Sequence, residues 1–282
     1  MACDSTLNVF SLNTRGLRSR WKRLTLYRHL KNKRYDVVCL QETHITKEVK
    51  NQWEREWGKG LFVCCDFTAN SSGQIILFRK NLVEKTTVLY RSQRILAVEI
   101  EVSDKKITII NIYAPNNNME KLVFFEELGS VISDNASEGL IVCGDFNCVL
   151  NNKLDIVSGE PHSTNTVSRF HDLIENNDLY DTWRLFHPDE KQFSWSKKHP
   201  FIARRLDYIL TNSLIFDKTL ECDIYSVPSS DHRGCFINLK LDNTERGPGF
   251  WKFNNSLLED KTFVDKMNKL IDDHISESIN ED

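Results

Sequence analysis

The 282-residue chain lacks any long apolar stretch. No segment approaches the roughly 20 apolar residues that a membrane-spanning helix needs, so we expect no membrane partner. Residues 1–10 contain neither an apolar run nor a basic lead-in, so we expect no signal peptide. No repeat with a period of about 20–50 residues is visible, which argues against a solenoid.

Paired cysteines of the CxxC type are also absent, although the chain has eight cysteines. Cys39, Cys64, Cys143, Cys222 and Cys235 lie in or beside apolar, strand-like runs. A chain of this length can bury a sizeable core without disulfides. We therefore expect buried thiols in a reducing compartment and no zinc site.

An overall excess of positive charge is missing too, since the net charge is −3, and this argues against a nucleic-acid partner. The distribution of charge points the other way. Nine Lys and Arg residues lie between Arg15 and Arg34, and this segment contains no acidic residue. A solvated helix face explains such a run in many proteins. Beside a catalytic cleft, the same run would instead bind phosphates.

The most informative stretch that is present is LIVCGDFN at 140–147. Its four apolar residues predict a buried strand, and Gly144 lets the backbone turn as it leaves the sheet. Asp145 and Asn147 follow with Phe146 between them, so in an extended chain they would share one face. A carboxylate that accepts a proton beside an amide that orients water suits hydrolysis. A strand that simply ends in a polar turn fits this stretch alone equally well.

Apolar runs alternate with amphipathic segments along the chain, which predicts a mixed α/β fold. Strands are expected at 7–13, 35–40, 61–67, 74–79, 97–102, 107–112, 140–143, 193–195, 206–210, 222–227 and 235–241, and helices at 21–33, 47–57, 119–132, 166–176 and 257–275. Hairpins mixed with helices favour a four-layered α/β sandwich, two packed mixed sheets flanked by helices, over residues 1–242. The Gly- and Pro-containing stretch 243–249 predicts a linker, so 243–282 should form a separate segment.

Polar residues follow the ends of the expected strands. They are Asn13, Glu42, Tyr113, Asn116, Asp145, Asn147, Asp207, Asp231 and His232. Each one alone is explained as a cap or turn residue, but loops at one end of a sandwich face each other, so the set can meet in one pocket. Several carboxylates with a single imidazole and no thiol favour Mg²⁺, with Mn²⁺ as an alternative. Magnesium keeps waters and takes its other ligands from a substrate phosphate.

Five short motifs resemble those of the endonuclease/exonuclease/phosphatase superfamily. They are LQET at 40–43, NIYAPN at 111–116, GDFN at 144–147, RLDY at 205–208 and SDH at 230–232, in family order. Within the superfamily, the chain is most similar to the apurinic-type endonuclease domain of non-LTR (LINE) retrotransposons. The stretch 247–255 resembles the connector that leads to the reverse transcriptase in those polyproteins.

The resemblance implies a role for each site residue. The catalytic residues would be Asn13, Tyr113, Asp145, Asn147, Asp207 and His232, and the metal ligands Glu42 and Asp231. The DNA-binding residues would be Arg15, Asn116, Ser194, Lys197, Lys198, Arg204, Arg205 and Ser230. Lys197 to Arg205 form a basic loop, for which an exposed charged turn is the alternative. Arg15 stands where repair enzymes of this superfamily carry a second metal-site Asp, so metal binding should depend more on Glu42.

Within these roles, Asp145 would deprotonate or orient the attacking water and Asn147 would fix its approach. Tyr113 would lie against the scissile phosphate. His232, paired with Asp207, would donate to a phosphoryl oxygen, since a carboxylate partner favours the imidazolium.

The implied activity is that of a Mg²⁺-dependent endonuclease that nicks one strand of duplex DNA and leaves a 3′-hydroxyl to prime reverse transcription. Such a domain would be joined covalently to a reverse transcriptase, translated in the cytoplasm and active in the nucleus. Three alternatives remain: an apurinic-site repair nuclease, a phosphatase, and an inactive DNA-binding module. Arg15 and the connector argue against repair, and the intact catalytic set argues against an inactive module.

Overall fold

The computed structural model describes residues 6–58, 60–65, 72–80, 85–102, 105–228, 230–240 and 261–279. The chain divides into two compact units, Met1–Asp242 and Asn243–Asp282. In the second unit, helix α7 covers Lys261–Ile279, whereas the sequence predicts a helix at 257–275. The connector-like stretch 247–255 and the rest of 243–260 lie outside the described residues.

The described strands of the first unit form two six-stranded sheets and a small three-stranded sheet. Sheet A has the order β14 (Thr219–Ser226), β15 (Arg233–Lys240), β1 (Thr6–Asn13), β2 (Val37–Gln41), β4 (Ile75–Phe78) and β3 (Leu61–Cys64). Sheet B has the order β10 (Leu179–Asp181), β13 (Asp207–Asn212), β8 (Gly139–Asp145), β7 (Lys105–Tyr113), β6 (Ile95–Val102) and β5 (Lys85–Arg91). The small sheet contains β11 (Trp195–Lys197), β12 (Ile202–Arg204) and β9 (Ile156–Val157).

Each large sheet is mixed, because one parallel pair interrupts the antiparallel pairs. Strands β1 and β2 are parallel and are connected through α1 (Arg20–Lys33). Strands β7 and β8 are parallel and are connected through α3 (Asn118–Asn135). Parallel neighbours need such a crossover, and it brings the ends of both strands to the same edge of the sheet. The ends of β1, β2, β7 and β8 carry the polar residues singled out in the sequence.

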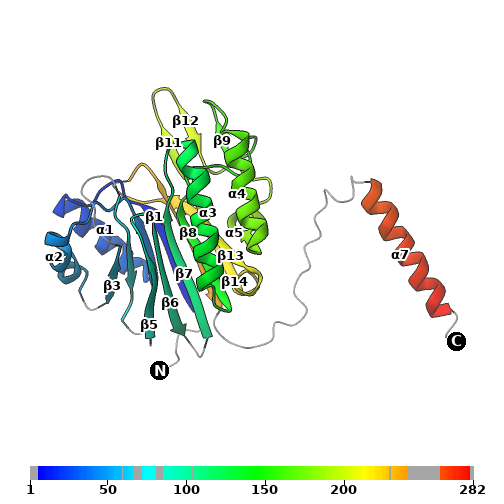
Figure 1. Cartoon of the computed structure of the whole chain (residues 1–282), viewed down its shortest axis with the longest axis horizontal. Coiled ribbons are helices and arrows are strands. Elements are labelled where there is room, and N and C mark those ends of the chain that lie inside the picture. Colours follow the sequence, from blue (N-terminus) through cyan, green and yellow to red (C-terminus); the bar gives the residue numbers. More distant parts are fainter. Residues whose placement is uncertain are drawn as a thin grey trace. The chain divides into compact units, whose positions relative to one another are not determined.

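Helices cover the outer faces of both sheets (Figure 1). Helices α1 and α2 (Lys47–Trp57) pack on sheet A through residues such as Tyr27 and Trp53, and α3 and α4 (Thr164–Asn176) pack on sheet B through Phe125 and Phe170. A third apolar cluster, which includes Val37 of sheet A and Ile109 of sheet B, fills the space between the sheets. The predicted four-layered sandwich is confirmed.

Side chains of strand β8 pack into a separate apolar cluster on each face of sheet B. Ile141 and Cys143 belong to the cluster between the sheets, whereas Leu140 and Val142 belong to the cluster under α3 and α4. Alternate side chains of a strand point to opposite faces, and both faces here are covered. A continuous apolar run therefore fits a central strand in this fold.

The sequence missed several short or polar elements. They are β5, β9, β10, β12, α5 (Thr182–Phe186) and α6 (Ser213–Lys218), and strand β11 lies two residues later than predicted. Such elements depend on pairing and packing with distant segments, which local patterns do not report.

The expected turn at 103–104 lies outside the described residues. The seven described cysteines are all buried, and no described helix is long and apolar enough to span a membrane.

Candidate active site

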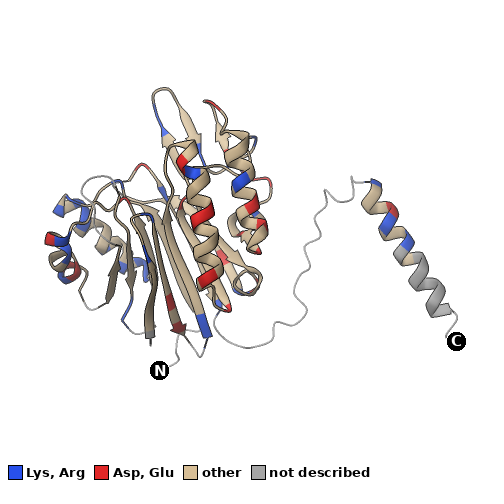
Figure 2. Ribbon diagram, viewed as in Figure 1, with Lys and Arg blue, Asp and Glu red and all other residues tan. Residues whose placement is uncertain are grey.

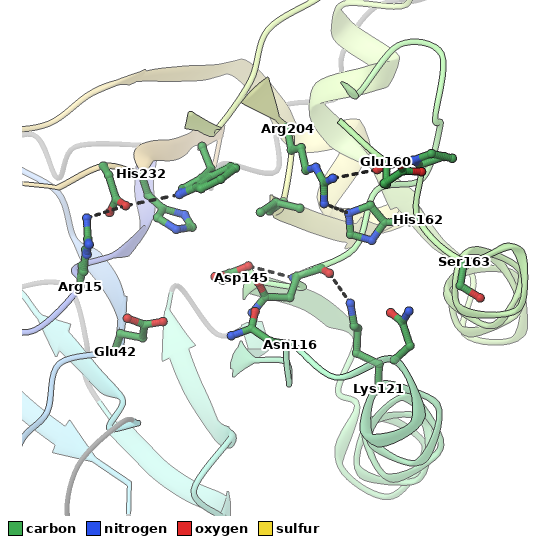
Figure 3. Close-up of a pocket in the computed structure, with 16 residues that line it drawn as sticks. Arg15, Glu42, Asn116, Lys121, Asp145, Glu160, His162, Ser163, Arg204 and His232 are labelled. Atoms are coloured by element: carbon green, nitrogen blue, oxygen red, sulfur yellow. Dashed lines mark hydrogen bonds and ion pairs between the residues drawn. The ribbon is translucent and has the colours of Figure 1, made fainter. Parts of the chain in front are cut away.

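A cavity of about 460 Å³ opens at the edge where β1, β2, β7 and β8 end and where β13 and β15 begin. Figure 3 shows Arg15, Glu42 and His232 on one side of this pocket and Lys121, His162 and Arg204 on the other, with Asp145 and Asn116 between them. Asn147 and Asp231 also line it. Residues separated by more than two hundred positions in the chain therefore share one pocket.

Three hydrogen bonds at the base of this pocket each join a residue of one sheet to a residue of the other. Asn13 Nδ2 donates to Asp145 Oδ2 over 2.9 Å, His232 Nδ1 lies 2.8 Å from Asp207 Oδ2, and the Tyr113 hydroxyl donates to the Glu42 carboxylate. Asn13, Glu42 and His232 belong to sheet A or its loops, and Tyr113, Asp145 and Asp207 belong to sheet B. The site is thus assembled across the interface between the sheets.

Gly144 sets the position of Asp145 at the end of β8. Its φ is +138°, and a Cβ added here would lie 2.0 Å from the carbonyl oxygen of Ile112 on the neighbouring strand. Only glycine permits this close approach of β7 and β8. Asp145 consequently ends level with Tyr113, its register partner.

Asn147 does not continue the extended chain, and the sequence-based expectation was wrong on this point. Its φ is +46°, its backbone N–H donates to Asp145 Oδ1, and its side-chain amide donates to the carbonyl oxygen of Ala114. A tight turn, rather than strand alternation, therefore brings Asn147 to the pocket beside Asp145. Phe146 is buried and stacks on Phe170, with ring centroids 4.7 Å apart.

Several titratable groups at the base of the pocket have strongly shifted pKa values. Burial raises the pKa of Asp145 to about 7, and repulsion from the Asp207 carboxylate adds to this shift. Burial alone would lower the pKa of His232, but the Asp207 carboxylate, with which it is hydrogen-bonded, raises the pKa of His232 to about 9. Burial and the Glu42 contact raise the pKa of Tyr113, which stays protonated. The pocket thus holds a weak base beside a stable imidazolium.

Oxygen donors suitable for a hard divalent cation line the pocket. Among the described residues, Asp145, Asp207 and His232 have ligand atoms within 4.8 Å of one another. His232 keeps its proton and uses Nδ1 on Asp207, so it is a poor metal ligand. Glu42, with one carboxylate oxygen engaged by Tyr113, and Asp231, whose buried Oδ1 has no hydrogen-bond partner, remain as donors. This set fits Mg²⁺ better than a soft metal.

Asp231 is held in place by two neighbours. Arg15 Nη1 lies 3.0 Å from Asp231 Oδ2, and Trp195 Nε1 donates to the same oxygen over 3.3 Å. Asp231, a predicted metal ligand, therefore already has one carboxylate oxygen neutralised by Arg15. Glu42 has no such ion pair within the described part of the chain.

Five of the eight predicted DNA-binding residues lie at the surface, in two groups. Arg15, Asn116 and Arg204 line the pocket, and Lys197 and Lys198 are exposed at the hairpin formed by β11 and β12. Lys and Arg residues of α1, such as Arg20, Arg28 and Lys31, are exposed, and acidic residues lie along α3 (Figure 2). The surfaces near α1 and the hairpin therefore suit a polyanion, and the outer face of α3 does not.

Two predicted DNA-binding serines instead support the loops. Ser194 is fully buried, and its Oγ accepts hydrogen bonds from the backbone N–H groups of Leu206 and Asp207. Ser230 Oγ donates to the carbonyl oxygen of Asn13 and accepts from the N–H of His232. The prediction for Ser194 is wrong, because a side chain without exposed surface cannot contact DNA, and Ser230 fits a role in holding the last loop.

Arg205 was also predicted to bind DNA, and the structure corrects this. Its side chain is 1% exposed and forms bidentate ion pairs with Asp155 and Asp181 at 2.6–3.1 Å. Arg184 Nη2 adds a contact of 2.7 Å to Asp155. All three guanidinium nitrogens of Arg205 are therefore hydrogen-bonded to carboxylates inside the protein.

The sequence missed three residues that line the pocket: Lys121 and His162 on the side of Arg204, and Trp195 on the side of His232. Lys121 is buried and its Nζ donates to the carbonyl oxygen of Asn147 over 2.6 Å. His162 Nε2 accepts from Arg204 Nη1 over 3.0 Å, and burial, with Lys121 and Arg204 adding to it, lowers the pKa of His162 to about 4. Trp195 separates this pocket from a second cavity. The one available signal in the sequence was for Lys121, a lysine at an inward position of the helix expected at 119–132.

Comparison with known proteins gives a consistent assignment. The family described as Endonuclease/Exonuclease/phosphatase family matches residues 5–232. The Transposon TX1 uncharacterized 149 kDa protein of Xenopus laevis is 30% identical over 265 residues, which are 92% of this chain and 20% of that protein. The chain thus spans about a fifth of the length of this relative.

Other relatives match over nearly their whole length. An Exodeoxyribonuclease of Bacillus subtilis is 22% identical over 84% of this chain and 100% of its own. The AP endonuclease LMAP from Leishmania major has the same fold, with a TM-score of 0.73 over 84% of this chain and 88% of its own at 17% identity. Because the family match covers most of the chain, from residue 5 to residue 232, the chain belongs to the endonuclease/exonuclease/phosphatase family.

Proposed function

We propose that this protein is a divalent-metal-dependent endonuclease that cuts one strand of duplex DNA. The observation that carries the proposal is the pocket in which Asn13, Glu42, Tyr113, Asp145, Asp207 and His232 meet across two sheets. A buried base, a buried imidazolium and hard oxygen donors in one place suit the charge that develops at phosphorus during displacement.

The residues have distinct parts in this proposal. Asp145 accepts a proton from water, whose oxygen attacks phosphorus, while Asn147 helps to orient that water. The P–O3′ bond breaks and the departing oxygen takes a proton from solvent, which leaves a 3′-hydroxyl and a 5′-phosphate. His232 donates to a phosphoryl oxygen, and Asp207 holds its ring. Glu42, with Asp231, would hold the cation, whose chemistry is charge neutralisation at the phosphate.

The 3′-hydroxyl would prime reverse transcription of a mobile element. This step is supported by the similarity to a transposon protein of which the chain spans only about a fifth. A covalently attached reverse transcriptase, translation in the cytoplasm and action in the nucleus belong to the same proposal.

A plasmid assay tests the central activity. Supercoiled plasmid with Mg²⁺ should be converted to the relaxed form by the wild type, and Glu42→Ala should abolish this conversion. Glu175→Ala, which changes an exposed residue on α4, is the matched control and should nick at the wild-type rate. Equal behaviour of Glu42→Ala and wild type would exclude the proposed site.

Repair of abasic DNA is the second candidate, because the fold is shared with an AP endonuclease. The two functions differ in substrate preference. A matched pair of duplexes, one intact and one with a single abasic site, separates them. Similar cleavage of both supports the first proposal, and strong preference for the abasic duplex supports repair.

The pH dependence of nicking follows from the two shifted pKa values. Asp145 must lose its proton to act as a base, so kcat/KM should rise through about pH 7. His232 must keep its proton to donate to phosphate, so kcat/KM should fall as pH passes about 9. The expected profile at fixed free Mg²⁺ is a bell. His232→Gln should lose the upper limb, and an unchanged upper limb would contradict the role of His232.

A further inference from the structure

A cavity of about 530 Å³ lies at the edge of sheet A opposite the catalytic pocket. Phe78, in its wall, ends β4 and pairs with Val37, the first residue of β2, whereas Glu42 follows the other end of β2. The five residues of β2 span about 17 Å. We call this cavity the rear cavity. Its lining, within the described part of the chain, consists of Lys31, Trp57, Gly58, Gly60, Phe78, Arg79 and Lys80, none of which lines the catalytic pocket.

Three cations line the rear cavity, and only one of them has a carboxylate partner. Arg79 Nη1 lies 3.5 Å from Asp36 Oδ1, and the side chain of Asp36 is itself buried. Among the described residues, Lys31 and Lys80 form no ion pair with a carboxylate, and no carboxylate lines the cavity. Burial lowers the pKa of Lys31, and no acidic group counteracts this effect. An anionic ligand would therefore stabilise the charged form of Lys31.

Positive charge continues from the rear cavity to the end of α1. This helix contains no acidic residue, and Arg34, at its C-terminal cap, is exposed and donates its backbone N–H to the carbonyl oxygen of Lys31. The helix dipole favours cations at this end, which accounts for Lys31 and Arg34. It does not account for Arg79 and Lys80, which follow a strand. The cluster of four cations therefore needs another explanation.

The wall of the rear cavity supplies apolar surface and one unused donor. Trp57 and Phe78 are buried, and Lys31 Nζ lies 5.1 Å from the centre of a Trp57 ring. Trp57 Nε1 has no hydrogen-bond partner, and a Cβ added at Gly60 would lie 2.5 Å from it, so the indole N–H lies against the wall that Gly60 forms. A buried donor without an acceptor is unfavourable. The cavity thus suits a ligand that has both apolar faces and negatively charged oxygens.

We propose that the rear cavity binds single-stranded DNA, with a base or sugar against its apolar wall and backbone phosphates on Lys31 and Lys80. The choice of DNA rests on the proposed function, which makes DNA the substrate of this protein. A single strand fits better than a duplex because its bases are free to contact an apolar wall. An acidic peptide is less suited, since the regular charge of a phosphate backbone matches a row of cations. A strand bound there leaves the catalytic pocket free, so the protein would retain DNA between cleavage events.

Lys31→Ser and Lys80→Ser test the rear cavity, with Arg169→Ser as the control. Arg169 is an exposed cation on α4, on the outer face of sheet B. Binding of a labelled thymidine strand of about 12 nucleotides is measured by fluorescence anisotropy without divalent metal, so that no cleavage occurs. Each lysine variant should raise the Kd roughly fivefold, and the slope of log Kd against log salt should fall by about 0.7. Arg169→Ser should change neither value, and both lysine variants should nick duplex plasmid with a KM within about twofold of wild type.

Tryptophan fluorescence locates the contact. Lys31 lies over the Trp57 ring, so a strand that engages Lys31 should alter the emission of Trp57. The difference between wild type and Trp57→Phe isolates this emission. The change on adding the strand should be present in that difference for the wild-type lysine and lost when Lys31→Ser is combined with either background.

An unchanged Kd in the double variant Lys31→Ser/Lys80→Ser would overturn the proposal. A uridine strand of the same length that binds more than about tenfold tighter would assign the cavity to RNA instead. A glutamate-rich peptide that displaces the thymidine strand at a lower concentration than unlabelled strand does would assign it to an acidic protein segment. None of these measurements requires nicking, so their failure leaves the proposed function intact, whereas a wild type that binds the strand without nicking plasmid rejects only the proposed function.

Discussion

Replacing Asp145 with asparagine should lower the rate of plasmid nicking roughly a thousandfold, the usual scale for the loss of a general base. The carboxylate accepts hydrogen bonds from Asn13 Nδ2 and from the N–H of Asn147 at separate oxygens. An asparagine has one acceptor oxygen, so it satisfies only one of these donors and cannot take a proton from water. The measurement is the initial rate of conversion from supercoiled to relaxed plasmid.

The Asp145→Asn variant should remain folded. Burial of this carboxylate next to Asp207 raises the pKa of Asp145, so its ionised form is destabilising at neutral pH and a neutral side chain removes that cost. The melting temperature should stay close to that of the wild type, because this gain offsets the one donor that asparagine leaves unsatisfied. Asp134→Asn, an exposed change on α3, should nick normally. Nicking by Asp145→Asn within tenfold of the wild-type rate would contradict its role as the base.

Arg205→Leu should destabilise the first unit by about 3–5 kcal/mol, the range for breaking a buried ion pair from one side. The substitution leaves Asp155, which is fully buried, with Arg184 as its one remaining ion-pair partner, and removes both bonds to Asp181. A buried carboxylate that loses its bidentate partner keeps its desolvation cost. Urea unfolding followed by circular dichroism measures the change.

Two further variants provide a scale for the loss of stability expected of Arg205→Leu. Arg169→Leu breaks an ion pair with Glu126 in which both side chains are exposed, and should cost under about 1 kcal/mol. Arg205→Lys keeps the charge but not the planar fork, so its stability should lie between wild type and Arg205→Leu. An unfolding midpoint for Arg205→Leu equal to that of wild type would show that the network contributes nothing to stability.

The central strands and the gathering of polar residues could be predicted from the sequence because both follow from local rules. Apolar runs such as 140–143 are long enough to indicate buried strands, and parallel strands bring their ends to one edge. Asp145, Asn13 and Glu42 were placed at strand ends in this way, and all three lie at the base or side of one pocket. The family resemblance supplied the roles, and local pattern supplied only the positions.

Arg205 and Ser194 show where the sequence was insufficient. Both lie beside residues of the pocket, and a basic or hydroxyl side chain at such a position suits DNA contact. Their partners decide otherwise, since Asp155 is fifty residues from Arg205 and Asp207 is thirteen residues from Ser194. The local sequence pattern does not show whether a distant carboxylate or backbone amide will pair with a side chain inside the folded protein. For Asn147, the left-handed turn was equally invisible, because asparagine also fits an extended strand.

Because the hydrogen-bonded pairs at the base of the pocket span two sheets, the proposed activity should depend on the alignment of the two sheets. Gln41 Nε2 donates a further buried hydrogen bond of 2.7 Å between the sheets to Asn111 Oδ1. A slight slip of one layer over the other would separate every donor from its acceptor while leaving helices and strands intact. Cleavage should therefore be lost at denaturant concentrations well below the midpoint of the unfolding transition measured by spectroscopy.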